Sequence, residues 1–288
     1  MKIIRKECKF GSNENQKFYH ERFANYKEFY DVVMSRQNNH PHESLQEVFD
    51  NHSKSWLGVN SIEEATDMFL NGWQQNVERM KIAFKKELDT LEHDRPRKMV
   101  NSVAGFVPIV PNALLGLPNS MIDVRMSPKK SKILNFMVAI DRAGSNSVEE
   151  IIKKMSKTFA YIAMLERSGQ YRCRIEVFFT AFSEYGTSKP KTSMSVLVKS
   201  ENQLFDIKRL CFPVIHPAML RLFGFAWAES LPFDYDEIAY ESSYGTAFEY
   251  FSDRCKEDFI KVVNENNEKT ICLDLHSDIE KVLGKEVA

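Results

Sequence analysis

The stretch formed by residues 133–152 constrains the fold more than any other part of the chain. Residues 133–140 form an apolar run that is broken only by Asn135. Such a run is typical of a parallel strand that is buried on both faces. After Asp141 and a Gly/Ser turn, the spacing of apolar residues predicts an amphipathic helix over residues 148–167. A buried strand followed by a long helix is the first half of a β-α-β unit, so we expect an α/β protein.

The pattern continues toward the end of the chain. Residues 173–182 predict a second strand, and residues 192–199 alternate apolar with polar side chains, which is typical of an edge strand with one wet face. A late strand over residues 270–275 and a helix over residues 277–283 follow. We therefore expect a three-layer, mostly parallel sheet in residues 132–288, with binding surfaces beyond the carboxyl ends of its strands.

A helical region is predicted for residues 1–93. Aromatic side chains recur at spacings of three and four within residues 15–35, which predicts an amphipathic helix that packs on the body of the protein. Ser61, followed three residues later by a glutamate, predicts the start of another helix. Residues 94–131 contain five prolines, so we expect a connector without long regular structure that packs along the core or forms an interface.

Composition excludes several classes of protein. The 288 residues carry a formal net charge of −1, so no global attraction to nucleic acid or to an anionic membrane is implied. Five cysteines stand far apart, which favours reduced thiols over a disulfide framework or a zinc ribbon. No apolar run reaches the roughly 18 residues of a membrane span, and the first residues carry no secretory pattern. We expect a cytoplasmic protein without a membrane partner.

Two short elements resemble the von Willebrand factor A-like fold. The first is Asp141-Arg-Ala143-Gly-Ser145-Asn-Ser147 after the apolar strand, and the second is Phe178-Phe-Thr-Ala-Phe182-Ser183. The resemblance covers roughly residues 133–284. It implies a sheet of that type, a partner-binding or metal-binding surface at Asp141, Ser145 and Ser147, and a partner such as a ring ATPase or an assembly component.

The first element departs from the family pattern at one position. Ala143 stands where the family has its first metal-contacting hydroxyl. We therefore expect a degenerate site that holds no cofactor, in which Asp141 forms the turn and caps the helix. The alternative is an Mg²⁺ ion held by Asp141 and Ser145, because carboxylate and hydroxyl oxygens suit that ion.

Three further segments resemble a group of bacteriophage proteins. They are Ser55-Trp-Leu-Gly58 with Asn71-Gly-Trp73, Val103-Ala-Gly105 with Leu115-Gly-x-Pro-x-Ser-Met121, and His216-Pro-Ala-Met-Leu-Arg221. This resemblance implies a viral protein in the host cytoplasm, and a phage or host protein as its partner.

These observations predict a non-enzymatic protein-binding or assembly module, because no nucleophile motif or phosphate-binding glycine loop is present. His216, before a proline at a helix start, is interpreted as a capping or packed histidine.

The first alternative is a nucleic-acid-binding factor of replication or transcription. Two basic clusters support it: Arg95, Arg97 and Lys98, and Lys129, Lys130 and Lys132. The second alternative is a metal-dependent hydrolase that uses the acidic side chains of residues 229–241.

Overall fold

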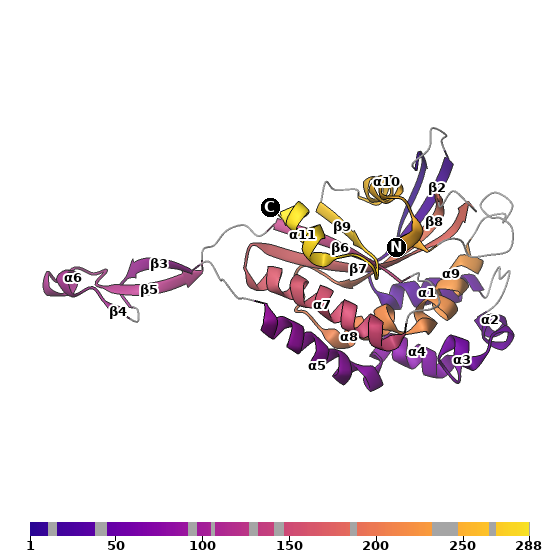
Figure 1. The fold of residues 1–288 in the computed structure, drawn as a ribbon, viewed down its shortest axis with the longest axis horizontal. Coiled ribbons are helices and arrows are strands. Elements are labelled where there is room, and N and C mark those ends of the chain that lie inside the picture. Colours follow the sequence, from indigo (N-terminus) through magenta and orange to yellow (C-terminus); the bar gives the residue numbers. More distant parts are fainter. Residues whose placement is uncertain are drawn as a thin grey trace.

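Two separate sheets organise the computed structural model (Figure 1). It describes residues 1–10, 16–37, 45–91, 97–104, 107–126, 132–140, 147–184, 189–231, 247–264 and 269–287. Six strands form the sheet of the body, and three short strands form the sheet of an arm that projects from it.

The sheet of the body is mixed and curled, with the strand order β1-β2-β8-β7-β6-β9. Its strands are β1 (Lys2–Cys8), β2 (Gln16–Phe23), β6 (Lys132–Ala139), β7 (Tyr171–Glu184), β8 (Lys189–Lys199) and β9 (Lys269–Leu273). Strand β6 pairs in parallel with both β7 and β9. Strand β8 is antiparallel to β7 and parallel to β2. The prediction of an α/β protein with a central parallel strand after residue 132 is confirmed.

Helices cover one face of this sheet and enclose the main core. They are α1 (Tyr26–Gln37), α2 (Leu45–Asn51), α3 (Lys54–Leu57), α4 (Ile62–Asn71), α5 (Gln74–Thr90), α7 (Val148–Arg167), α8 (Ile207–Ile215), the π-helix η1 (Met219–Gly224), α9 (Phe225–Glu229) and α11 (Ile279–Val287). The 3-10 helix η3 (Phe248–Tyr250) and α10 (Asp253–Val263) enclose a smaller core on the other face, around Phe18, Phe178 and Phe259.

Helix α7 shows why the sequence folds locally as predicted. Ser147 precedes it in extended conformation, and its side chain accepts the backbone N–H of Glu150, whose own side chain accepts the N–H of Ser147. This reciprocal pair satisfies two N–H groups that the helix leaves open. Residues Val148–Arg167 form the helix, as the apolar spacing predicts, and Ile152, Met155 and Phe159 bury its inner face.

The prediction of an edge strand over residues 192–199 is wrong. Strand β8 lies inside the sheet, between β2 and β7. The side chains of Ser193, Ser195 and Lys199, expected to be wet, are buried. Ser193 and Ser195 meet polar side chains of the neighbouring strands, and Lys199 Nζ donates to Glu166 of α7, so these polar residues avoid water by binding partners inside the protein.

The prediction of a helix over residues 15–35 is wrong in its first half. Strand β2 comes first, and α1 begins only at Tyr26. Phe18 and Tyr19 are both buried, although they are neighbours in sequence and belong to the cores on opposite faces of the sheet. Only a strand buries adjacent side chains in this way.

Residues 97–126 form the arm, where we expected a connector packed along the core. Its elements are β3 (Arg97–Ser102), β4 (Val107–Pro108), the short helix α6 (Val110–Leu114) and β5 (Met121–Met126). Strand β5 pairs with β3 and β4 in antiparallel fashion. Figure 1 shows that the tip lies far from the body, and α6 buries none of its side chains.

The main core draws on residues from Tyr19 to Leu283, so strands of the predicted helical region share one sheet with the later residues. The division of the chain at residues 93 and 131 into separate domains stays a prediction. No single helix in the described ranges is long and apolar enough to cross a membrane. One bent pair, α8 followed by η1 and α9 at an angle of 68°, is long and apolar enough for a membrane span, judged by length and composition alone.

Candidate functional site

The carboxyl edge of the central strands is where the sequence placed a binding surface. Strand β6 ends at Ala139, and the backbone N–H of Ile140 still donates to the carbonyl of Phe178 at 2.9 Å. Asp141 and Ser145 lie outside the described residues. The predicted role of that pair, for a partner or for Mg²⁺, stays a prediction.

Ser147 is the one member of the predicted site that the structure describes. Its hydroxyl oxygen accepts the N–H of Glu150 at 3.3 Å, and its own N–H donates to the Glu150 carboxylate at 3.1 Å. Ser147 therefore caps α7, a local role that accounts for its hydroxyl without a ligand.

Asp274 follows β9 at the same edge, since Leu273 of β9 pairs with Val138 of β6. One oxygen of its carboxylate accepts the Ser277 hydroxyl at 2.8 Å and the backbone N–H of His276 at 3.0 Å. The other accepts Lys256 Nζ at 2.8 Å.

Burial alone would raise the pKa of Asp274, but the hydrogen bonds from Lys256 and Ser277 outweigh burial and lower the pKa. The carboxylate thus braces β9 against α10. Within the described ranges, no group of three or more His, Cys, Asp or Glu side chains is placed to hold a metal ion.

A buried polar network joins β2 to β8 and β7, and the sequence did not reveal it. His20 Nδ1 lies 2.6 Å from the Ser193 hydroxyl, and His20 Nε2 lies 3.2 Å from the Ser195 hydroxyl. Ser195 donates to Glu176 at 3.0 Å, and Arg22 forms an ion pair with the same carboxylate. All but Arg22 are almost fully buried.

The other face of β2 carries a second buried carboxylate. Glu21 accepts Trp227 Nε1 at 2.7 Å, two guanidinium bonds from Arg36 at 2.7 and 2.9 Å, and the hydroxyl of Tyr19. Buried carboxylates need such partners, because an unpaired charge in the interior is costly. We name the residues Tyr19, His20, Glu21, Arg22, Arg36, Glu176, Ser193, Ser195 and Trp227 the polar joint.

The polar joint contains a chain of hydrogen bonds from Ser193 through His20 and Ser195 to Glu176, but its chemistry is that of a brace. Burial, aided by the charge of Arg22, lowers the pKa of His20 to about 3, so the ring is neutral near pH 7. Both ring nitrogens already have hydroxyl partners. One signal in the sequence could have revealed the joint: His20 and Arg22 alternate with the same period of two as Ser193 and Ser195.

His216 and the acidic side chains of residues 229–241 were the other candidates for chemistry in the sequence. His216 accepts the N–H of Ala218 at 3.1 Å and packs between the rings of Trp73 and Phe212, and burial lowers its pKa to about 4. The interpretation of His216 as a capping, packed histidine is confirmed. Of the acidic side chains in residues 229–241, Glu229 is buried and the others lie outside the described residues.

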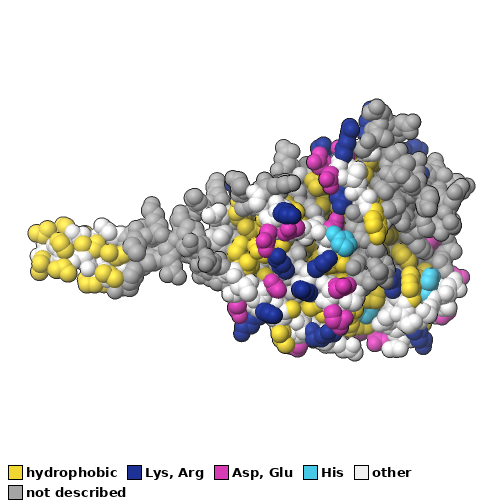
Figure 2. Space-filling view, in the orientation of Figure 1, with side chains coloured by type: hydrophobic (Ala, Val, Ile, Leu, Met, Phe, Trp, Pro, Cys, Tyr) yellow, Lys and Arg dark blue, Asp and Glu magenta, His cyan; other side chains and the backbone are white. Residues whose placement is uncertain are grey.

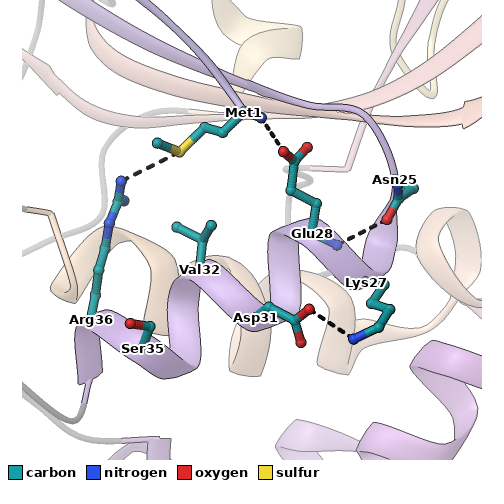
Figure 3. Close-up of a pocket in the computed structure, with 8 residues that line it drawn as sticks. All are labelled: Met1, Asn25, Lys27, Glu28, Asp31, Val32, Ser35 and Arg36. Atoms are coloured by element: carbon teal, nitrogen blue, oxygen red, sulfur yellow. Dashed lines mark hydrogen bonds and ion pairs between the residues drawn. The ribbon is translucent and has the colours of Figure 1, made fainter.

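An open hollow of about 510 Å³ lies between the start of the chain and α1 (Figure 3). The amino group of Met1 forms an ion pair with Glu28, and Lys27 Nζ lies 2.8 Å from Asp31. Arg36, also at its rim, is engaged by Glu21. Each of these charged groups thus already has an ionic partner.

The basic clusters flank the arm. Backbone pairing places Lys98 opposite Arg125, and Arg97 opposite Met126, where β3 and β5 meet the linkers to the body. Lys132 begins β6 and is exposed, whereas Arg95, Lys129 and Lys130 lie outside the described residues.

Comparison with known proteins identifies one family. A family model described as "Domain of unknown function (DUF7192)" matches residues 5–277. The chain belongs to the DUF7192 family. No curated protein and no solved structure matches it.

The arm lies within residues 5–277, which the DUF7192 model matches. Its tip is held by backbone hydrogen bonds: Ile109 donates to Ser120 at 2.7 Å, Ala113 to Ile109 at 3.0 Å, and Leu117 to Asn112 at 2.9 Å. Gly116, at a φ of +67°, allows the reversal after α6. The DUF7192 tip therefore has an ordered backbone from which its side chains project.

Apolar side chains cover this tip (Figure 2). Six large aliphatic residues of the arm are exposed, from 41% for Val107 to 82% for Leu114; the others are Val103, Val110, Leu115 and Leu117. Residues 100–122 contain no Asp, Glu, Lys, Arg or His. The sequence analysis left open that this segment forms an interface, but it did not predict the projecting arm; the uncharged run between two basic clusters was the signal for it.

Proposed function

We propose that this DUF7192 chain is a non-enzymatic binding or assembly module that holds another protein through its arm. The observation that carries the proposal is the exposed aliphatic tip. Leu114 is 82% exposed and Leu115 is 75% exposed, on a tip whose backbone is ordered by its own hydrogen bonds. A contiguous apolar surface of this kind marks an interaction site in a soluble domain.

The shape of the arm supports the same function. Three prolines and a hydrogen-bonded turn restrict the backbone between residues 107 and 120. A segment that is ordered before binding loses less conformational entropy when it binds, which favours affinity. The arm is thus suited to enter a groove on a partner.

The finer assignment of the body as a degenerate von Willebrand factor A-like domain remains part of the proposal. The succession β6, α7, β7 and the antiparallel β8 supports it. It implies a phage or host ATPase, or an assembly component, as the partner. A second contact at Asp141, Ser145 and Ser147 is then expected.

Affinity capture with matched variants tests this function. The tagged chain is compared with Leu114→Asp/Leu115→Asp, and with Ile82→Asp, which alters an exposed apolar residue of the body. Proteins retained by the unaltered chain and by Ile82→Asp, but lost from the arm variant, are expected. Retention of the same proteins by all three chains would refute arm-mediated binding.

Nucleic-acid binding is the second candidate, and one observation favours it. The register of β3 and β5 brings Lys98 opposite Arg125, which concentrates positive charge at the base of the arm. Binding to DNA should then weaken steeply as salt rises. Replacing Lys129, Lys130 and Lys132 together by Ala should abolish it, measured by fluorescence anisotropy; unchanged binding would exclude this surface. The metal-dependent hydrolase ranks last among these hypotheses.

A further inference from the structure

We propose that the protein partner of the arm is a second copy of this chain, whose acidic surface on α2 to α4 receives the apolar tip and the basic base of the arm. This inference rests on the proposed binding function and names its partner. It predicts a head-to-tail assembly, in which every copy both offers an arm and accepts one.

The partition of charge along the chain carries the first step. Residues 95–132 hold seven basic side chains and one acidic side chain, Asp123, a net charge of +6. Since the whole chain carries −1, the remainder carries −7. A near-neutral chain thus consists of a positive arm with its linkers and a negative body, and opposite charges of this size attract two copies to each other.

The negative charge of the body gathers on one segment. Residues 45–71 hold five acidic side chains, Glu47, Asp50, Glu63, Glu64 and Asp67, against one basic side chain, Lys54. All five are exposed or half-buried. We name this surface, from α2 through α4, the acidic surface.

Helix α4 adds an apolar contact to the acidic surface. Glu63, Asp67 and Leu70 follow one another at spacings of four and three, so they lie on one face of the helix. All three are exposed, Leu70 to 47%. An exposed leucine beside two carboxylates complements an arm that pairs an apolar tip with a basic base.

The backbone of the tip makes burial against a partner feasible. Its N–H groups at Ile109, Ala113 and Leu117 donate to carbonyls of the same tip. Burying polar groups that already have partners costs little, whereas burying open ones costs several kcal/mol. Docking therefore removes aliphatic side chains from water without stranding the backbone.

The two surfaces differ, so the contact is heterologous. A heterologous contact repeats from copy to copy and produces a closed ring or an open filament. A dimer in which two arms meet would instead bring two positive arms together. The charge partition favours the head-to-tail arrangement.

Light scattering during size-exclusion chromatography tests the assembly. The full chain is expected to form oligomers at high micromolar concentration, with a dissociation constant that rises at least about tenfold when salt is raised, because ion pairs contribute to the contact. Leu114→Asp/Leu115→Asp and Glu63→Lys/Asp67→Lys should each be monomeric, and Ile82→Asp should behave as the unaltered chain. Circular dichroism confirms folding; Leu114→Ser replaces the double arm variant if that one fails to fold.

Mixing the two monomeric variants gives the deciding result. One retains an intact acidic surface and the other retains an intact arm, so a single productive contact remains and a 1:1 dimer is expected. No dimer in the mixture, or oligomers of the charge-reversed variant alone, would overturn the head-to-tail contact.

A monomeric full chain would overturn self-association while leaving the proposed function intact, provided that the arm variant still loses its captured proteins. If the chain is monomeric and the arm variant captures the same proteins as the unaltered chain, the proposed function fails as well, and flotation of the monomer with vesicles containing phosphatidylserine would assign the arm to an anionic membrane.

Discussion

The polar joint and the arm invert the usual distribution of side chains. In the joint, the carboxylates of Glu21 and Glu176 lie in the interior of the sheet. In the arm, Leu114 and Leu115 lie almost entirely in water. Each arrangement is unfavourable unless partners compensate for it.

The difference between the two regions lies in where those partners are. Each buried carboxylate of the joint has arginine, hydroxyl or indole donors from other strands and helices of the same chain. The aliphatic side chains of the arm have no comparable cover among the described residues. The joint therefore stabilises the monomer, whereas the aliphatic side chains of the arm stay exposed in it; under the proposed function, a second molecule covers them.

Glu21→Ala should have the largest effect of the changes considered. It leaves Arg36 as a mostly buried charge without its carboxylate, and removes the acceptor of Trp227. Breaking a buried pair on one side costs about 3–5 kcal/mol. Urea unfolding, followed by circular dichroism, should show a loss of that size in the free energy of unfolding.

Glu78→Ala is the matched control, because Glu78 pairs with Lys81 on the surface of α5 and both side chains are exposed. An exposed pair of this kind contributes at most about 0.5 kcal/mol. If Glu21→Ala cost no more than Glu78→Ala, the joint would not be what holds β2 in the sheet.

The pH dependence of stability gives the next effect. Since the pKa of His20 is about 3 in the folded protein and that of an unperturbed histidine is about 6.5, the unfolded chain binds the proton first. The contribution of His20 to the free energy of unfolding is therefore fully present above about pH 6.5. It is lost as the pH drops from there toward 3, by up to about 1.4 kcal/mol per pH unit. Urea unfolding at several pH values measures this slope.

His20→Gln separates this contribution from that of His216, whose pKa of about 4 gives the same sign over a narrower range. The variant should lose part of the slope between pH 4 and 6. A slope equal to that of the unaltered chain would show that His20 does not stay neutral in the folded protein.

The sequence predicted those elements whose signals are local. The apolar run before Asp141 is β6, and the range of α7 is correct to the residue, because a cap and a 3.6-residue period define a helix without reference to distant parts. Ser61 and Gly72 likewise delimit α4. No distant contact was needed for these predictions.

The sequence could not predict pairings between distant segments. The alternation in β8 was interpreted as a wet edge, because a polar face is compatible both with water and with His20, 173 residues away. The aromatic spacing in β2 suited a helix as well as a strand. The strands of the arm were not predicted because its five prolines and glycines between 105 and 118 are typical of a loop, whereas antiparallel pairing with β5 orders it.

Ser147→Ala tests the sequence-predicted edge of the sheet and should have a smaller effect. It removes the acceptor for the N–H of Glu150, which costs about 1 kcal/mol at a helix start. Ser61→Ala removes the equivalent acceptor from α4 and should cost about the same. Thermal unfolding with and without Mg²⁺ distinguishes a cap from a ligand. Stabilisation by Mg²⁺ that vanishes in Ser147→Ala alone would contradict a purely capping role.

Leu114→Asp should have the smallest effect on the monomer, although it has the largest expected effect on association. Because 82% of this side chain is already in water, folding changes its surroundings little, and an exposed substitution stays within about 0.5 kcal/mol. Leu134→Ala, at a buried position of β6, should cost about 2–5 kcal/mol in the same dilute urea titration. If Leu114→Asp lowered the free energy of unfolding by more than about 1 kcal/mol, well beyond the spread of exposed substitutions, the tip would have to pack on its own chain. The contrast between arm and joint would then disappear.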